Sequence, residues 1–344
     1  MSKVNLYDQN GYLNIPKIKY MADRDRISFI VIIGSRQVGK TYGTLKLMTE
    51  QASGKYPKPF ILMRRTQAET DFILHNALNP FAAIDPNITC KRASGYHGDI
   101  IRRGETAESD ERIGIVLALT TVSKIRGFSG AVFTDLVYDE FIPERHVQRF
   151  RGEGDAFLNA VVTISGNREL EDRPPLRVWL LANANDFNSP VLSALNLTAK
   201  IESMKVHEQE LSIMPDRGIM VVLPRSEQLI ERRKQTAIAK ATSERTTFAR
   251  MAFDNDFAYN DSTGVRAINL RDYRYVCSVP ERFAVYQHKG TGAVAVVDAV
   301  NVQPFCRNAA QFNRYCPWAR QAFINDRIIF DSLRVRSDFE DFIL

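Results

Sequence analysis

Residues 34–41 read Gly-Ser-Arg-Gln-Val-Gly-Lys-Thr and match the pattern G-x-x-x-x-G-K-[ST], which constrains the fold more than any other feature of the chain. The apolar run at residues 27–33 is typical of a buried strand, and residues 41–48 can form a helix. In that setting the glycines let backbone N–H groups face an anion, and the helix N-terminus adds a favourable dipole. The sequence therefore predicts a phosphate-binding loop between a strand and a helix.

The loop residues have separate expected roles. Lys40 is expected to reach the β- and γ-phosphates of ATP, and the Thr41 hydroxyl is expected to bind Mg²⁺. The other residues are expected to surround the phosphates, and they are Gly34, Ser35, Arg36, Gln37, Val38 and Gly39. The alternative is a glycine-rich turn that binds nothing, which the flanking strand and helix disfavour.

A second motif is expected to complete the site. The apolar run at residues 131–138 ends in Asp139 and Glu140, as in a Walker B strand. Mg²⁺ requires oxygen ligands, so Asp139 is expected beside Thr41, and Glu140 is expected to polarise the attacking water. Asp135 is a rival acid, but it lies inside the apolar run.

Other polar residues follow or precede the predicted strands. Asn183 ends the apolar run at residues 176–182, where it could sense the γ-phosphate or the water, or simply make a turn. Lys124 and Arg126 precede the Asp-Glu strand. They could reach a phosphate or a neighbouring subunit, or lie in a basic surface loop.

Strands and helices alternate over the first part of the chain, which predicts an α/β fold with a mostly parallel sheet. We divide the chain into an ATPase domain (1–203), a basic helical linker (204–262) and a small α+β domain (263–344). Residues 221–250 contain seven basic and three acidic residues, which suits a solvated helix face or a contact with a polyanion. Three closely spaced strands after residue 272 predict an antiparallel meander.

Composition sets broad limits. The chain has 344 residues and a formal net charge of +6, which is compatible with a polyanionic partner. The four cysteines include no C-x-x-C pair, so no zinc site is indicated. We found no run of membrane-spanning length and no signal-peptide pattern, and we expect a soluble intracellular protein. Asp298 ends the third strand of the meander, but metal-dependent nucleases need several clustered carboxylates.

Taken together, these segments resemble the DNA-packaging ATPases of small short-tailed bacteriophages, relatives of the large terminase motors. The resemblance spans nearly the whole chain. It is strongest over the phosphate loop and three further segments, residues 139–142, 166–169 and 181–184. It continues into residues 226–257 and the segment that ends at Asp298.

The resemblance implies an ASCE-type, RecA-like P-loop ATPase and an RNase H-like C-terminal domain that has lost nuclease chemistry. It implies a ring, pentameric in the family, that docks on the portal of an empty capsid, with or without a scaffold RNA, and drives double-stranded DNA inward. Such a protein is expected in the host cytoplasm, transiently on the procapsid and not in the mature virion. The resemblance also implies that Asp139 is the Walker B acid and that Glu140 is the catalytic glutamate.

The family also implies an arginine that acts on the neighbouring subunit's site. Gly166 stands where some relatives have an arginine, so Arg168 is our substitute for it. Lys124 and Arg126 resemble basic residues that also reach across subunits, and Arg64 and Arg65 match a pair for which DNA contact is plausible.

Three other functions remain open at this point. One is a terminase that also cuts DNA, and another is a small-molecule or nucleotide kinase built on the same loop. The third is a nucleotide-gated assembly protein with negligible turnover.

Overall fold

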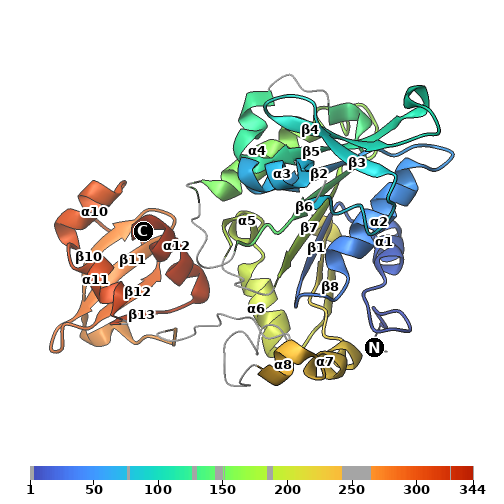
Figure 1. Ribbon diagram of the computed structural model, residues 1–344. Helices are drawn as coiled ribbons and strands as arrows, with labels where there is room; N and C mark the ends of the chain where they lie inside the picture. Colours follow the sequence, from blue (N-terminus) through green and yellow to red (C-terminus); the bar gives the residue numbers. More distant parts are fainter. Residues whose placement is uncertain are drawn as a thin grey trace. The chain divides into compact units, whose positions relative to one another are not determined.

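The structure is a computed structural model, and it describes residues 4–75, 78–125, 130–143, 150, 152–183, 189–241, 265–325 and 327–343. The chain divides into two compact units (Figure 1). One comprises Met1–Phe187 and Lys200–Ala258, and the other comprises Asn188–Ala199 and Tyr259–Leu344.

The first unit, in its described residues, is built on a nine-stranded sheet with the order β3-β4-β5-β2-β6-β7-β1-β9-β8. The central pairs, from β5 to β9, are parallel, whereas β3-β4, β4-β5 and β8-β9 are antiparallel. The strands are β1 (Phe29–Gly34), β2 (Phe60–Arg64), β3 (Ile88–Arg92), β4 (His97–Arg102), β5 (Glu111–Ala118), β6 (Asp135–Asp139), β7 (Arg177–Asn183), β8 (Leu211–Met214) and β9 (Ile219–Val222). The predicted α/β fold with a mostly parallel sheet is confirmed.

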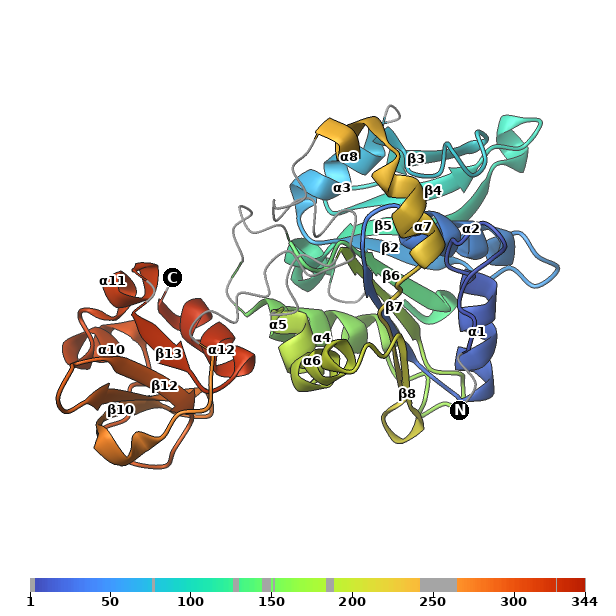
Figure 2. The ribbon, with the colours of Figure 1, turned by 90° about the horizontal axis from the view of Figure 1, so that it is seen from below.

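The helices of this part of the chain are mostly short. They are α1 (Ile15–Arg24), α2 (Lys40–Ala52), α3 (Gln67–Leu74), α4 (Glu153–Ser165), α6 (Thr198–Val206), α7 (Glu227–Lys234) and α8 (Ala237–Ala241), whereas α5 (Pro190–Ala194) falls in the second unit. Helices α1 and α2 lie on one side of the sheet and α4 lies on the other, as Figures 1 and 2 both show.

Both faces of the central strands are buried, which explains their continuous apolar runs. Side chains alternate between the faces, so Ile30 and Ile32 of β1 join the core that includes α1 and α2. On the opposite face, Tyr138 of β6 stacks on Phe157 of α4, with ring centroids 5.7 Å apart. The sheet is therefore covered on both sides, and its carboxyl edge remains for chemistry.

The N-terminal residues form an arm that packs within the first unit. Ile15, Ile18 and Met21 of α1 are buried, and so is Leu13, whereas Tyr12 is partly exposed. The residues we assigned to a helical linker are only partly helical, because β8 and β9 form an antiparallel pair at the edge of the sheet.

The second unit contains a four-stranded sheet, in the order β10-β11-β12-β13 over the residues described. The strands are β10 (Tyr273–Val279), β11 (Phe283–His288), β12 (Val294–Asp298) and β13 (Ile328–Phe330), and the helices are α10 (Ala309–Tyr315), α11 (Ala319–Ile324) and α12 (Leu333–Ile343). The expected antiparallel meander is β10-β11-β12, and β13 adds a parallel strand that we did not foresee.

The core of this unit is rich in aromatic rings. Phe283 and Phe339 meet with ring centroids 5.2 Å apart, and Phe312 packs edge-on against Phe283 at 5.9 Å. The second unit therefore has its own apolar core.

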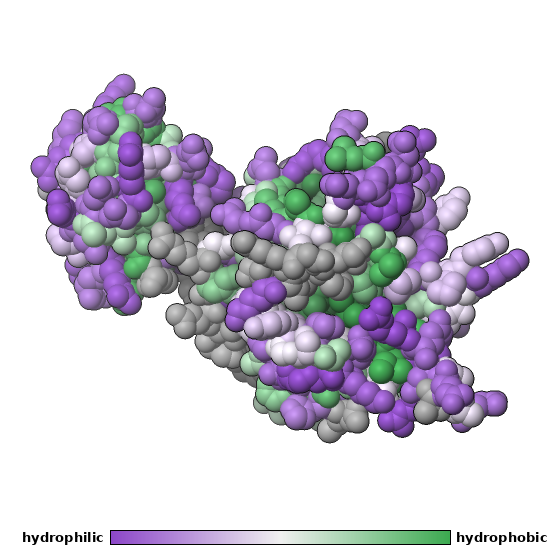
Figure 3. All heavy atoms as spheres, turned by 90° about the horizontal axis from the view of Figure 1, so that it is seen from above, coloured by the Kyte–Doolittle hydropathy of each residue, from purple (hydrophilic) through white to green (hydrophobic). Residues whose placement is uncertain are grey.

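On the face of the molecule drawn in Figure 3, hydrophilic residues predominate, and hydrophobic residues form smaller patches between them.

Candidate functional site

The phosphate loop joins the end of β1 to the start of α2. Gly39 has φ 89° and Gln37 has φ 62°, so the backbone passes twice through the left-handed region before the helix begins. A Cβ on Gly34 would lie 2.5 Å from Cγ of Pro224, so a side chain does not fit there. Glycine is therefore required at the two positions for different reasons, conformational at Gly39 and steric at Gly34.

Lys40 is buried inside the curve of this loop. Its Nζ donates to the Gly34 carbonyl at 2.9 Å, to the Ser35 carbonyl at 2.7 Å and to Oδ1 of Asn183 at 3.2 Å. Burial lowers the pKa of Lys40 to about 7. Negatively charged phosphate oxygens beside Nζ would favour its charged form, so the pocket suits a polyanion.

Asn183 reaches Lys40 because β7 is the neighbour of β1. Asn183 pairs in register with Gly34, which puts both residues at the carboxyl edge of the sheet. The structure therefore brings this predicted residue to the phosphate loop.

Asp139 lies at the same edge, at the end of β6. The Thr41 hydroxyl donates to its Oδ1 at 2.9 Å. Burial raises the pKa of the Asp139 carboxyl above its usual value. One hydroxyl and one carboxylate oxygen this close fit the hard oxygen ligands that Mg²⁺ prefers, so Thr41 and Asp139 are the residues that would hold it.

Glu140 follows directly and has φ 54°, a strained conformation for a residue with a side chain. Its side chain is 53% exposed, in contrast to that of Asp139 at 7%. The turn after β6 therefore separates two adjacent acids, one buried beside Thr41 and one that faces outward.

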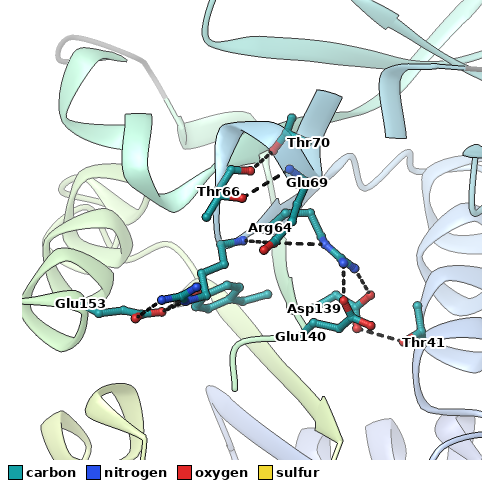
Figure 4. Close-up of polar contacts among 10 residues, drawn as sticks. Thr41, Arg64, Thr66, Glu69, Thr70, Asp139, Glu140 and Glu153 are labelled. Atoms are coloured by element: carbon teal, nitrogen blue, oxygen red, sulfur yellow. Dashed lines mark hydrogen bonds and ion pairs between the residues drawn. The ribbon is translucent and has the colours of Figure 1, made fainter. Parts of the chain in front are cut away.

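Arg64 pairs with both acids, which the sequence did not reveal to us (Figure 4). Its NH1 donates to Oδ2 of Asp139 at 2.9 Å, and its NH2 bonds Oε2 of Glu140. Arg64 ends β2, and β2 pairs with β6 in parallel, with Met63 opposite Tyr138. The signal was thus available only once the neighbouring strands were known.

The DNA contact we considered for Arg64 and Arg65 does not agree with their positions. The Arg65 side chain is 1% exposed and its Nε donates to Oε1 of Glu153 at 2.6 Å. Arg64 is 17% exposed and is paired with the site acids. Both arginine side chains are therefore bound to acidic residues of their own subunit.

Arg168 is also used within its own subunit, which corrects our choice of it as the trans-acting arginine. Its NH2 donates to the carbonyls of Gly130 at 3.1 Å and Phe133 at 2.9 Å, and its Nε donates to that of Ser165 at 3.1 Å. The chain turns back after α4, so the guanidinium caps the helix end and is buried.

Lys124 lies on the surface in η3 (Leu119–Ile125), with Nζ 5.3 Å from the centroid of the Tyr96 ring. Arg126 lies outside the described residues. Asp135, the rival acid, is at the opposite end of β6 and accepts from Nε1 of Trp179 at 3.0 Å. It therefore takes no part in the site.

The order of the strands defines the class of protein. Strand β7 lies between β1, which carries the phosphate loop, and β6, which carries the Asp-Glu pair. One strand between those two motifs, with a polar residue at its end beside the loop lysine, is the arrangement of the ASCE-type P-loop ATPases.

Residues 8–308 match the family described as podovirus DNA encapsidation protein (Gp16). The chain belongs to this family, and its function is the packaging of viral DNA into the capsid. Among curated protein sequences, none matches the chain.

Two solved structures are similar over almost their whole length. The Phi-28 gp11 DNA packaging motor has a TM-score of 0.63 and 13% identity, covering 95% of this chain and 96% of that one. The bacteriophage Phi-29 viral genome packaging motor assembly has a TM-score of 0.59 and 18% identity, covering 96% and 97%. At these sequence identities the structural similarity shows the fold alone. No helix in the part of the chain described here is long and apolar enough to span a membrane.

Proposed function

We propose that the chain packages DNA by hydrolysing ATP with Mg²⁺ at the site formed by Lys40, Thr41, Asp139 and Glu140. The observation that carries this proposal is the 2.9 Å contact between the Thr41 hydroxyl and Asp139, with the Lys40 ammonium at the adjoining loop. A hydroxyl, an acid and an ammonium at the mouth of a phosphate loop suit phosphoryl transfer.

The residues divide the work. Lys40 and the loop N–H groups bind the phosphates, and Thr41 and Asp139 hold the metal. Mg²⁺, when bound, neutralises charge on the transferred phosphoryl group. Glu140 orients the attacking water and accepts its proton, while Asn183 is placed to contact the same water or the γ-phosphate.

Arg64 holds Oε2 of Glu140, so that oxygen is not available to the attacking water while the pair is intact. We propose that the Arg64–Glu140 pair opens before hydrolysis, which the exposed position of Glu140 permits. This requirement offers a point at which DNA or a neighbouring subunit can control turnover.

The remaining parts of the proposal extend the family's function to its partners. We propose a homo-oligomeric ring, pentameric like that implied by the resemblance, that grips double-stranded DNA through its phosphates at the portal of an empty capsid. Lys124 is an exposed candidate for contact with the neighbouring subunit, and Arg126 remains one. With Arg168 bound within its own subunit, we do not assign the arginine that acts in trans. We place the protein in the host cytoplasm, docked on the procapsid during packaging.

A nuclease activity is disfavoured by the residues around Asp298. Arg334 pairs with Asp298, and Oδ2 of Asp331 accepts the Asp298 backbone N–H at 2.8 Å. Within the described part of the chain, no group of three or more His, Cys, Asp or Glu is placed to hold a metal ion. We therefore propose that the C-terminal unit does not cut DNA.

The test is uptake of DNA into empty capsids, measured as DNA protected from added nuclease. We expect protection only with the chain, ATP and Mg²⁺ together. Protection without ATP, or a chain that hydrolyses ATP without taking up DNA, would contradict the proposal. Cleavage of plasmid DNA by the chain with Mg²⁺ or Mn²⁺ would instead favour the cutting terminase.

A further inference from the structure

The phosphate loop is enclosed by two segments of its own unit that the sequence motif does not mention. On one side is the N-terminal arm, whose Leu13 N–H donates to the Val38 carbonyl at 3.0 Å. On the other is the segment before and within α7. There, Pro224 lies so close to Gly34 that a Cβ on that glycine would be 2.5 Å from its ring.

Arg233 makes a polar contact between α7 and the loop. Its side chain is buried, with 6% of the residue exposed, and its NH1 donates to Oγ of Ser35 at 2.6 Å. Burying a guanidinium is unfavourable unless acceptors or opposite charges surround it. The contact with Ser35 therefore helps to offset the cost of burying the Arg233 guanidinium beside the loop.

Two cationic side chains converge on Ser35. The carbonyl of Ser35 accepts from Lys40 Nζ at 2.7 Å, while its hydroxyl accepts from Arg233 at 2.6 Å. Like charges repel, so a phosphate bound beside the loop would stabilise both side chains. The start of the loop is thus doubly cationic, with one charge from the motif and one from α7.

Helix α7 is well fixed apart from this contact. Ser226 caps it by accepting the Leu229 N–H at 3.3 Å, and Leu229 is buried in the core of the sheet. In the chain, α7 and α8 are the last described elements before residue 265, where the described part of the C-terminal unit begins. A nucleotide that acts on Arg233 therefore acts on α7.

We propose that Arg233 is a positioning residue of the nucleotide site, which orients the start of the loop through Ser35 and makes the stability of α7 depend on the bound phosphates. This inference rests on the proposed function, because it requires that the loop bind a nucleotide. It adds a cationic group from the same chain to a site for which we expected an extra arginine only from a neighbouring subunit.

The test compares nucleotide binding and amide hydrogen exchange in the full chain. Arg233→Met removes the charge and keeps an apolar stem for the buried site, and Arg233→Lys keeps the charge. Arg232→Met is the matched control, because Arg232 precedes it on α7 but donates to the Asn10 carbonyl at 3.1 Å and not to the loop. The probes are ADP and ATPγS, each with Mg²⁺.

We expect Arg233→Met to weaken ATPγS binding about tenfold, which is the size of one charge-assisted hydrogen bond. Arg233→Lys should restore part of the lost affinity. Arg232→Met should change the affinity less than about twofold. In the wild type, ATPγS should slow exchange in both the loop and residues 227–234. In Arg233→Met at saturating ATPγS, the loop should remain protected and the extra protection of α7 should be lost.

The outcomes are distinct. A wild-type chain that binds neither probe contradicts the proposed function itself. A wild type that binds ATPγS without any change in exchange at α7, or an Arg233→Met variant that binds and protects like wild type, overturns only the role of Arg233. If Arg233→Met does not fold, Ser35→Ala tests the same contact from the loop, and unchanged α7 protection in that variant would refute the coupling.

Discussion

Asp139 and Asp298 each end an apolar strand, and each pairs with an arginine, yet only one belongs to a site with plausible chemistry. Asp139 is 7% exposed and shares its edge of the sheet with Thr41 and Lys40. Asp298 is 71% exposed; its carboxylate accepts from Arg334 and from the Ala299 N–H, and its own N–H donates to Asp331. The difference lies in what the neighbouring elements bring to the strand end.

Arginine has opposite consequences in the two places. At Asp139 the pair with Arg64 is buried, so the carboxylate depends on its partner, and Arg64 also holds the adjacent Glu140. At Asp298 the pair with Arg334 is near the surface, where ion pairs contribute little. Comparing equivalent substitutions in the two pairs shows whether burial accounts for the difference.

The largest expected effect is on turnover. Glu140→Gln should lower ATP hydrolysis by about 10² to 10⁴ fold while ATP binding is kept, because the amide cannot accept the proton of the attacking water. Steady-state phosphate release and nucleotide binding measure the two separately. Asp298→Asn is the matched control, and it should hydrolyse ATP at the wild-type rate; near-normal turnover in Glu140→Gln would remove the assigned role.

The next effect is on stability at the buried pair. Arg64→Met should lower the free energy of unfolding by about 3 kcal/mol, because it leaves the buried Asp139 carboxylate without its cation. Arg334→Met should lower it by less than about 1 kcal/mol. Denaturant unfolding with a probe in each unit measures both, and equal losses in the two variants would contradict the comparison.

The sequence was informative where one segment contains its own explanation. The loop at residues 34–41 predicted the turn, the helix start and the lysine, because the glycine conformations and the N-terminal helix dipole are local. The contacts of Arg64 and Arg168 could not be predicted from local sequence, because each depends on which strand or helix end lies beside the arginine. Arg64 faces Asp139 only through the pairing of β2 with β6, and Arg168 reaches carbonyls more than one element away.

Arg168 provides a further test of this lesson. Arg168→Ala should lower the free energy of unfolding by about 2 kcal/mol, because the carbonyls of Gly130, Phe133 and Ser165 would lose their donor. If the residue acts only within its own subunit, then mixing the variant with wild type should dilute hydrolysis in proportion to the fraction of variant. A sharper loss of activity at low fractions of variant would instead restore a role across the subunit interface.

The smallest effect is expected at the second strand end. Asp298→Asn should change the free energy of unfolding by less than about 0.5 kcal/mol, because the carboxylate is exposed and its pairing with Arg334 is solvated. DNA uptake into empty capsids should also be unchanged. Asp298→Asn can also contradict the comparison. If the substitution impairs DNA uptake but leaves ATP hydrolysis intact, then the strand end in the second unit has a function of its own that does not involve metal binding. The lack of a neighbour like Thr41 would then not make Asp298 functionless.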